Sequence, residues 1–462
     1  MSDRWYKFGV IYELNVRTYA DSNGDGIGDL RGLISRLDYL ARLGVTCIWL
    51  MPFYPSPLRD DGYDVTDHYA VHPDLGTLGD FVQLIHHAEA RGIRVLVDLV
   101  INHTSIDHPW FLAARQRHPI YHDFYVWADE KPKDAESGLV FPGVQKTTWS
   151  WDEETGRWYF HRFYEHQADL NLENPEVREE LERVIGFWAE LGVSGFRLDA
   201  APFLIEVGME REKPEQRYEY LHELRASLDW RRGDAILLGE ANVDRESVKK
   251  FFGEGGMHML FNFALNQHLW LALAREEAGP LGDGLKLSAG IPGTDQWANF
   301  LRNHDEVDLG NLGKAKEEVF RAFGPDEHMQ AYGRGIRRRV APMLGNDRRR
   351  LELAFSLMFT LPGTPVIYYG DEIGMGDDLS LPEREPVRTP MQWSKGKNGG
   401  FSTAEASHLA APVIGEGEFG YQQVNEADQR QDPGSLLTWM ESLVQARKEM
   451  PEFGTGSYEV LD

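Results

Sequence analysis

Three acidic residues, Asp199, Glu240 and Asp305, each stand at or just beyond the end of a short apolar run. Such runs are typical of buried strands, and the loops beyond strand ends are where a barrel of alternating strands and helices gathers its catalytic groups. Glycoside cleavage with retained configuration needs two carboxyl groups, one ionised as nucleophile and one protonated as acid. We therefore expect these residues to converge on one cavity that acts on a sugar.

Eight short β-rich runs recur along the chain, with helical patterns between them. The runs are residues 9–14, 46–50, 94–100, 195–199, 235–240, 257–261, 297–302 and 365–369. Strands that alternate with helices indicate a parallel sheet, and eight repeats favour its closure. The predicted fold class is therefore α/β, with a (β/α)8 TIM barrel.

The third and fourth strand runs are separated by about ninety residues, far more than the short loops usual in such units. We expect an inserted subdomain over residues 104–167, between the third strand and the third helix, with a hairpin over residues 151–160. Residues 1–103 and 168–450 then form the barrel. The aromatic side chains expected to roof the cavity from this insert are Trp110, Trp127, Trp149, Trp151 and Trp158.

The net charge and the single cysteine limit which partners and which covalent links this chain can have. The formal net charge is −26, which argues against binding to nucleic acid or to an anionic membrane surface and favours a neutral small-molecule substrate. Cys47 is the only cysteine, so no intrachain disulfide can form. The first residues lack the pattern of a signal peptide, and no run is long enough to span a membrane, which predicts a cytoplasmic protein. The sequence sets no oligomeric state.

Four short motifs stand at the ends of predicted strands. They read D-L-V-I-N-H at 98–103, G-F-R-L-D at 195–199, G-E-A-N at 239–242 and N-H-D at 303–305. In this order they resemble the strand-end motifs of the α-amylase clan, glycoside hydrolase family 13, and the resemblance extends over nearly the whole chain. It adds the expectation of an enzyme that acts on α-glucosides through a covalent glucosyl intermediate.

The resemblance implies a role for each carboxylate: Asp199 is the nucleophile, Glu240 the general acid/base and Asp305 the group that orients substrate hydroxyls. Arg197 stands two residues before Asp199 on a strand, so both point to the same side, and we expect its guanidinium to hold Asp199 ionised. For Glu240, an enclosed pocket and the neighbouring Asp305 are expected to raise the pKa.

Further positions match residues that touch the sugar in this family. His103 and His304 resemble the two histidines that bond sugar hydroxyls, and Asp98 resembles the aspartate that orders the pocket base around the arginine at position 197. The expected substrate-binding residues at the closed end of the pocket are Tyr63, Asp64 and Arg388. A pocket closed at that end admits a terminal glucosyl unit, which favours short α-glucosides such as maltose.

A second site is suggested by residues 21–29, where oxygen-bearing side chains alternate with glycines. Such a loop can wrap a hard cation, although Gly32 stands where a full EF-hand loop has its last glutamate. The expected ligands are Asp21, Asn23, Asp25, the Ile27 carbonyl and Asp29. A similar loop binds calcium in the oligo-1,6-glucosidase branch, so we expect a structural Ca²⁺, with Mg²⁺ as the alternative ion and a metal-free turn as the alternative structure. No cofactor is expected in catalysis.

Residues 167–171, Q-A-D-L-N, resemble the Q-P-D-L-N marker of the branch that contains oligo-1,6-glucosidases and trehalose synthases. Residues 50–64 and 387–393 look most like the trehalose synthases. This implies isomerisation of maltose to trehalose, with a hydrolysing α-glucosidase as the alternative. A non-catalytic sugar-binding relative is disfavoured because all three carboxylates are present. Residues 451–462 stand where relatives begin a C-terminal β-sandwich domain, which we expect to be absent or truncated.

Overall fold

The computed structural model describes residues 4–207 and 215–461, and within them the central element is a closed barrel of eight parallel strands. The barrel strands, in chain order, are β1 (Ile11–Leu14), β2 (Cys47–Leu50), β3 (Arg94–Leu99), β9 (Gly195–Leu198), β12 (Ile236–Gly239), β13 (Met259–Phe261), β14 (Gln296–Phe300) and β18 (Thr364–Tyr368). Each of the eight predicted runs overlaps one strand, and the predicted TIM barrel is confirmed.

Alternating positions of each strand face the two sides of the barrel wall. On β2, Cys47 and Trp49 pack in the barrel interior, whereas Ile48 and Leu50 pack in the larger core between the barrel and its helices. All four are fully buried, which explains why the strands read as continuous apolar runs. Burial raises the pKa of the Cys47 thiol, as expected for a cysteine that acts as a small apolar side chain.

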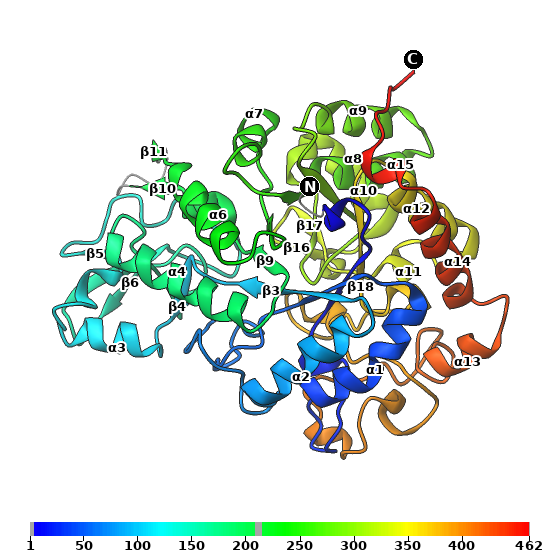
Figure 1. Cartoon of the computed structure of the whole chain (residues 1–462), viewed down its shortest axis with the longest axis horizontal. Helices are drawn as coiled ribbons and strands as arrows, with labels where there is room; N and C mark the ends of the chain where they lie inside the picture. The colour runs from blue at the N-terminus through cyan, green and yellow to red at the C-terminus, as the bar shows by residue number, and fades with distance from the viewer. Residues whose placement is uncertain (1–3, 208–214, 462) are drawn as a thin grey trace.

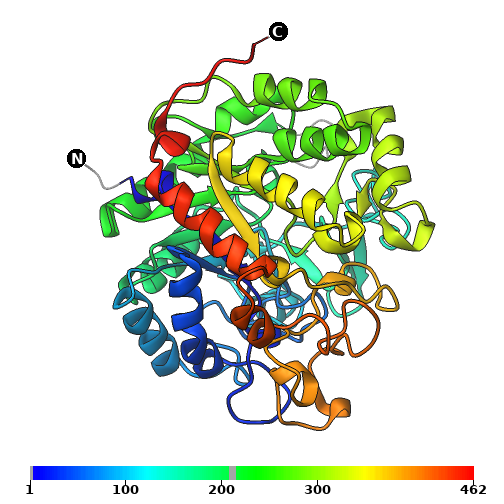
Figure 2. The same cartoon turned by 90° about the vertical axis from the view of Figure 1, so that its right-hand side faces the viewer.

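Helices cover the outside of the barrel (Figure 1). The longer ones are α1 (Leu30–Leu43), α2 (Leu78–Glu89), α4 (Pro175–Glu190), α6 (Glu219–Arg231), α8 (Phe263–Arg275), α9 (Gly279–Ser288), α10 (Lys316–Phe323), α12 (Arg348–Thr360) and α14 (Leu436–Glu449). Several begin at a side-chain cap, such as Asp29 before α1 and Asn174 before α4. The late helix α14 packs against both α12 and α1 and so completes the ring (Figure 2).

The insert between β3 and α4 has its own small sheets. β4 (His103–Ser105) pairs with β8 (Gln167–Asp169), and a second sheet joins β5 (Trp127–Ala128), β7 (Arg157–Phe160) and β6 (Trp149–Asp152). The β6–β7 pair is the predicted hairpin, and α3 (Pro109–Arg115) lies beside it at one end of the molecule (Figure 1). The insert is confirmed at its predicted place, while its domain boundaries stay a prediction.

The structure also contains short helices and strands that the sequence patterns did not indicate. They are α5 (Ala201–Leu204), β10 (Glu206–Val207), β11 (Glu215–Gln216), α7 (Arg245–Val248), β15 (Val307–Asp308), β16 (Gln330–Ala331), β17 (Gly335–Ile336), α11 (Val340–Met343), α13 (Glu426–Gln431) and α15 (Glu452–Thr455). β15, β17 and β16 form one antiparallel sheet. Among the described residues, no helix combines the length and the apolar character that crossing a bilayer requires.

Candidate active site

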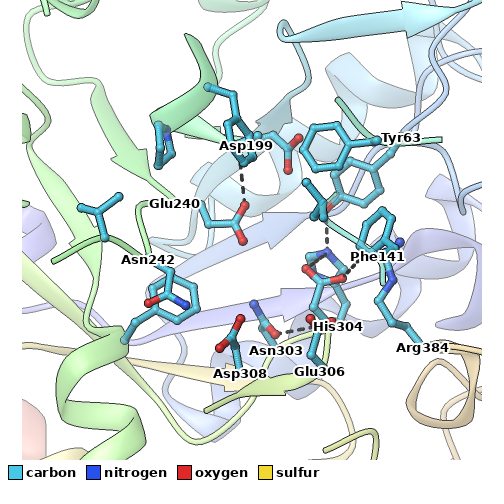
Figure 3. A pocket seen from close by; sticks show the side chains of 18 of the residues that line it. Tyr63, Phe141, Asp199, Glu240, Asn242, Asn303, His304, Glu306, Asp308 and Arg384 are labelled. Carbon is cyan, nitrogen blue, oxygen red and sulfur yellow. Dashed lines mark hydrogen bonds and ion pairs between the residues drawn. The ribbon is translucent and has the colours of Figure 1, made fainter. Parts of the chain in front are cut away.

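The structure brings the three predicted carboxylates into one cavity of about 340 Å³. Figure 3 shows Asp199 and Glu240 in this cavity. Asp199 and Glu240 each follow the last residue of a barrel strand directly, β9 and β12, and Asp305 stands five residues beyond β14. Parallel strands of a closed barrel end on the same face, which is why residues from three distant segments meet here.

Arg197 is the centre of the arrangement. It is fully buried, and its Nη1 donates to Oδ1 of Asp199 at 2.5 Å and to Oδ1 of Asp98 at 2.9 Å. Its Nη2 donates to Oε2 of Glu240 at 2.7 Å. One guanidinium therefore holds the expected nucleophile, the expected acid and a supporting carboxylate together. The sequence analysis indicated the contacts with Asp199 and Asp98 but not the one with Glu240.

The charge states of Asp199 and Glu240, the expected nucleophile and acid, follow from their burial. Burial raises the pKa of Asp199 to about 6; Arg197 opposes the shift, while Asp98 and Asp305 add to it. Asp199 is therefore still largely ionised at neutral pH, as expected, and Arg197 favours its charged form, although desolvation outweighs the ion pair and leaves the pKa above its ordinary value. Burial, with Asp199 and Asp305, also raises the pKa of Glu240 against the pull of Arg197, in the expected direction.

Asp305 is ionised for a different reason. Burial opposes its charge, but His304 and Arg384 outweigh burial and hold the pKa of Asp305 well below its usual range. His304 in turn places Nδ1 2.6 Å from Oε1 of Glu13 and Nε2 3.2 Å from Oδ2 of Asp305. These two carboxylates overcome burial and raise the pKa of His304 to about 9, so it is an imidazolium at neutral pH.

Tyr63 and His103 line the same cavity, as predicted for residues that contact sugar. The Tyr63 ring stacks on His304 with centroids 5.4 Å apart, and its hydroxyl donates to Oδ2 of Asp98 at 3.0 Å. His103 Nε2 lies 3.0 Å from the Tyr63 carbonyl, and burial lowers the pKa of His103 to about 4. Asp98 also accepts from Trp49 Nε1 at 3.1 Å and is fully buried, which fits the supporting role expected of it.

Asp64, expected to grip the sugar, does not line the cavity. It is fully buried, and it accepts from Ser56 Oγ at 2.7 Å and from the Arg59 amide at 3.1 Å. Asp60 lines the cavity in its place. The intervening turn reverses the chain at Gly62, whose φ of +102° is left-handed, so the direction of each side chain could not be read from the sequence.

Arg388 likewise lies behind the cavity wall and not in it. It donates to the His304 carbonyl at 3.0 Å and to Oδ1 of Asp305 at 3.2 Å. The arginine that lines the cavity is Arg384, which donates to Oδ1 of Asp305 and to Oδ1 of Asp60, both at 2.6 Å. Arg384 and Arg388 flank the 3-10 turn Glu385–Val387 and both donate to Asp305, so a second arginine close to Arg388 in the sequence is a signal that could have found Arg384.

The insert supplies phenylalanines, and not its tryptophans, to the wall of the cavity. Phe141 and Phe163 line the cavity. Trp149 packs inside the insert against Phe160 and Ala135. None of the five tryptophans expected to roof the cavity is among its lining residues, so that expectation is wrong. Trp110 stacks on His68 outside the insert, and Trp151 packs on Trp158 in the hairpin.

Residues 21–29 form a turn held by its own hydrogen bonds. Oδ1 of Asp21 accepts from the Asn23 and Gly24 amides at 2.9 and 2.7 Å. Asp29 accepts from Ser22 Oγ and, as the N-cap of α1, from the Gly32 amide at 2.7 Å. Across the described residues, no three acidic, histidine or cysteine side chains are placed to hold a metal ion together. The donor types suit a hard cation, but Asp29 is committed to the helix cap.

Comparisons with known proteins agree with this geometry. The model "Alpha amylase, catalytic domain" matches residues 14–322 and 329–456. A trehalose synthase of Thermus thermophilus is 46% identical over 100% of this chain, which spans about half (48%) of that protein. A "Trehalose synthase/amylase" of Mycobacterium tuberculosis is 44% identical over 99% of this chain and 77% of its own length.

A solved structure of similar fold is the α-amylase from H. orenii. It superposes with a TM-score of 0.80 and 32% identity, over 99% of this chain and 85% of that one. Its likeness and the family model both cover the strands that bear Asp199, Glu240 and Asp305. The chain belongs to the α-amylase family, glycoside hydrolase family 13.

Proposed function

We propose that this chain is the catalytic unit of a trehalose synthase, which converts maltose to trehalose through a covalent glucosyl-enzyme. The observation that carries the proposal is its similarity, from end to end, to proteins named for that activity. The cavity supplies the chemistry, since both carboxyl groups that a retaining glycosidase needs lie against one guanidinium.

In the first step a carboxylate oxygen of Asp199 attacks the anomeric carbon of the terminal glucose. The bond to the glycosidic oxygen breaks, and Glu240 gives its proton to that oxygen, so glucose is released within the cavity. In the second step Glu240 removes the proton from the anomeric hydroxyl of the released glucose. That oxygen then displaces Asp199. Two inversions restore the α configuration at the donor carbon, and attack by the α anomer of the released glucose completes the α,α linkage.

The electrostatics support this division of labour. The raised pKa of Glu240 keeps a proton available for the leaving oxygen. Asp305 stays ionised and, with Asp60 and Arg384, forms a charged end to the cavity where sugar hydroxyls can be held. An end closed by this ion-pair chain favours a single terminal glucosyl unit.

Hydrolysis is the second candidate, because the Mycobacterium tuberculosis relative is named both synthase and amylase. The same carboxylates serve both outcomes. The difference is whether water or the retained glucose attacks the glucosyl-enzyme, and this depends on how far the cavity excludes water.

Incubation with maltose, followed by chromatographic separation of the sugars over time, tests the proposal. Trehalose should be the main product, with glucose minor, and incubation with trehalose should yield maltose. The Asp199→Asn variant should form neither product. Release of two glucose molecules per maltose with no trehalose would contradict isomerisation and support the hydrolytic candidate.

We propose in addition that the loop over residues 21–29 takes a structural cation through Asp21, Asn23, Asp25 and the Ile27 carbonyl. The support is the clustering of hard oxygen donors in one short loop. Ca²⁺ should then raise the melting temperature of chelator-treated protein, since a ligand bound only by the folded state stabilises it. The Asp25→Ala variant should show no such rise. Equal melting of the native sequence with and without Ca²⁺ would remove the site.

A further inference from the structure

Three segments far apart in the chain meet at the edge of the catalytic cavity. They are the end of the insert, the turn between β16 and β17, and the loop after β18. Glu383, on that loop, accepts hydrogen bonds through Oε2 from the Tyr164 hydroxyl and from the Tyr332 hydroxyl, the latter at 2.9 Å. Tyr164 belongs to the insert and Tyr332 to the turn, so one carboxylate joins all three segments.

The two tyrosines bonded to Glu383 also pack against the cavity wall. The Phe141 ring lies against Tyr164 and Tyr332, with centroids 4.7 and 4.9 Å away. The Arg384 guanidinium lies 4.9 Å from the centroid of the Phe141 ring (Figure 3). Both Phe141 and Arg384 line the cavity. Arg384 is also the residue next to Glu383, so the position of Glu383 constrains the arginine that reaches Asp305.

The backbone is strained on both sides of this contact. Tyr332 has a φ of +57° and Glu383 a φ of +39°, values that bulky side chains rarely adopt. Arg337 supports the loop through Nη1, which donates to the carbonyls of Leu381 and Glu383 at 2.9 Å. Strained residues persist where surrounding contacts over-determine them, and they gather at functional sites. Two such residues, bonded to each other at the edge of a cavity, therefore indicate that this contact has a functional role.

We propose that Glu383 is a positioning residue whose bonds to Tyr164 and Tyr332 hold the three segments together and so limit the access of water to the glucosyl-enzyme. This inference rests on the proposed isomerisation. With the bonds in place, Phe141 and Arg384 keep their places in the wall, and the released glucose is the main acceptor. Without them the segments separate more often, and water competes more strongly.

Product partition tests the inference. On maltose, Glu383→Ala should raise the ratio of glucose to trehalose several-fold. Glu383→Gln should stay close to the native ratio, because its amide oxygen can accept from both tyrosines. Tyr332→Phe, which loses one bond and keeps the ring, should fall between them. Asp378→Ala is the control: Asp378 lies on the same loop, and among residues 4–207 and 215–461 its side chain bonds only to Ser380, so this variant should match the native enzyme. An unchanged ratio in Glu383→Ala would overturn the proposal.

Hydrogen–deuterium exchange separates this inference from the proposed function. In Glu383→Ala, exchange should quicken together in residues 140–164, 330–336 and 379–385, and the barrel strands should keep native protection as evidence of folding. If the native enzyme made only glucose, isomerisation would fail, while coordinated quickening would still support the linkage of the segments. Native exchange in all three segments would overturn the linkage whatever the products are.

Discussion

At the scale of single residues, one buried positive charge faces more negative charge than it can neutralise. Arg197 contacts Asp98, Asp199 and Glu240 directly. Asp305, the next acid in the cavity, has its own cations, His304 and Arg384. The carboxyls around Arg197 therefore retain a proton more readily than isolated acids do. In Glu240, burial together with Asp199 and Asp305 raises the pKa, which fits the proposed role of acid.

The pH profile should show the raised pKa of Asp199. As the proposed nucleophile, Asp199 must be ionised, and its pKa lies at about 6 instead of the ordinary 3.8, so we expect activity to fall as pH drops through about 6. Measuring kcat/KM for maltose between pH 4 and 8 checks this, because that parameter reports the free enzyme. A fall in activity near pH 4 instead would mean that Arg197 lowers the pKa of Asp199 more than burial raises it, and would contradict this prediction.

At the scale of elements, the sequence was a good guide to strands and a poor one to loops. Apolar runs predicted the barrel because each strand is buried on both faces. Asp199 and Glu240 were placed well because each directly follows a strand. Asp64 and Arg388 were misplaced because loop turns, not strand alternation, decide which neighbouring side chain faces the cavity. Phe141 could not be found because it reaches the cavity only through the packing of the insert.

The 3-10 turn η7 (Asp371–Ile373), which follows β18, contains a carboxyl that should affect stability. Glu372 is fully buried and accepts from the hydroxyls of Tyr12 and Tyr39 at 2.7 and 2.5 Å. Burial raises its pKa from 4.5 to about 7, so the folded state binds this proton more tightly than the unfolded state does. The contribution of protonated Glu372 to the free energy of unfolding is therefore complete below about pH 4.5 and is lost as pH rises through about 7.

Glu372→Gln mimics the neutral acid at every pH. Its free energy of unfolding relative to the native sequence should therefore increase between pH 5 and pH 8, by up to about 3 kcal/mol from the size of the pKa shift. Urea unfolding at the two pH values measures the difference. A relative stability that does not change with pH would show that Glu372 titrates normally in the folded protein.

At the scale of the molecule, the barrel gathers the catalytic groups and the added segments enclose them. The insert, the β15–β17–β16 sheet and the loop after β18 all supply residues to the wall of one cavity: Val140, Phe141, Asp308, Arg334 and Arg384. The positions of the catalytic carboxylates could be predicted, because they follow the ends of barrel strands. The enclosure could not, because it arises from contacts between segments as much as 324 residues apart, as between Asp60 and Arg384.

The central claim is that Asp199 forms the covalent bond to glucose. A fluorinated α-glucosyl fluoride forms the glucosyl-enzyme faster than the glucosyl-enzyme breaks down, so the adduct accumulates. Mass spectrometry of the digested protein then locates the labelled residue. We expect one glucosyl group on the peptide that contains Asp199 and none in the Asp199→Asn variant. A label on another carboxylate, or continued release of fluoride with no labelled peptide, would contradict the account.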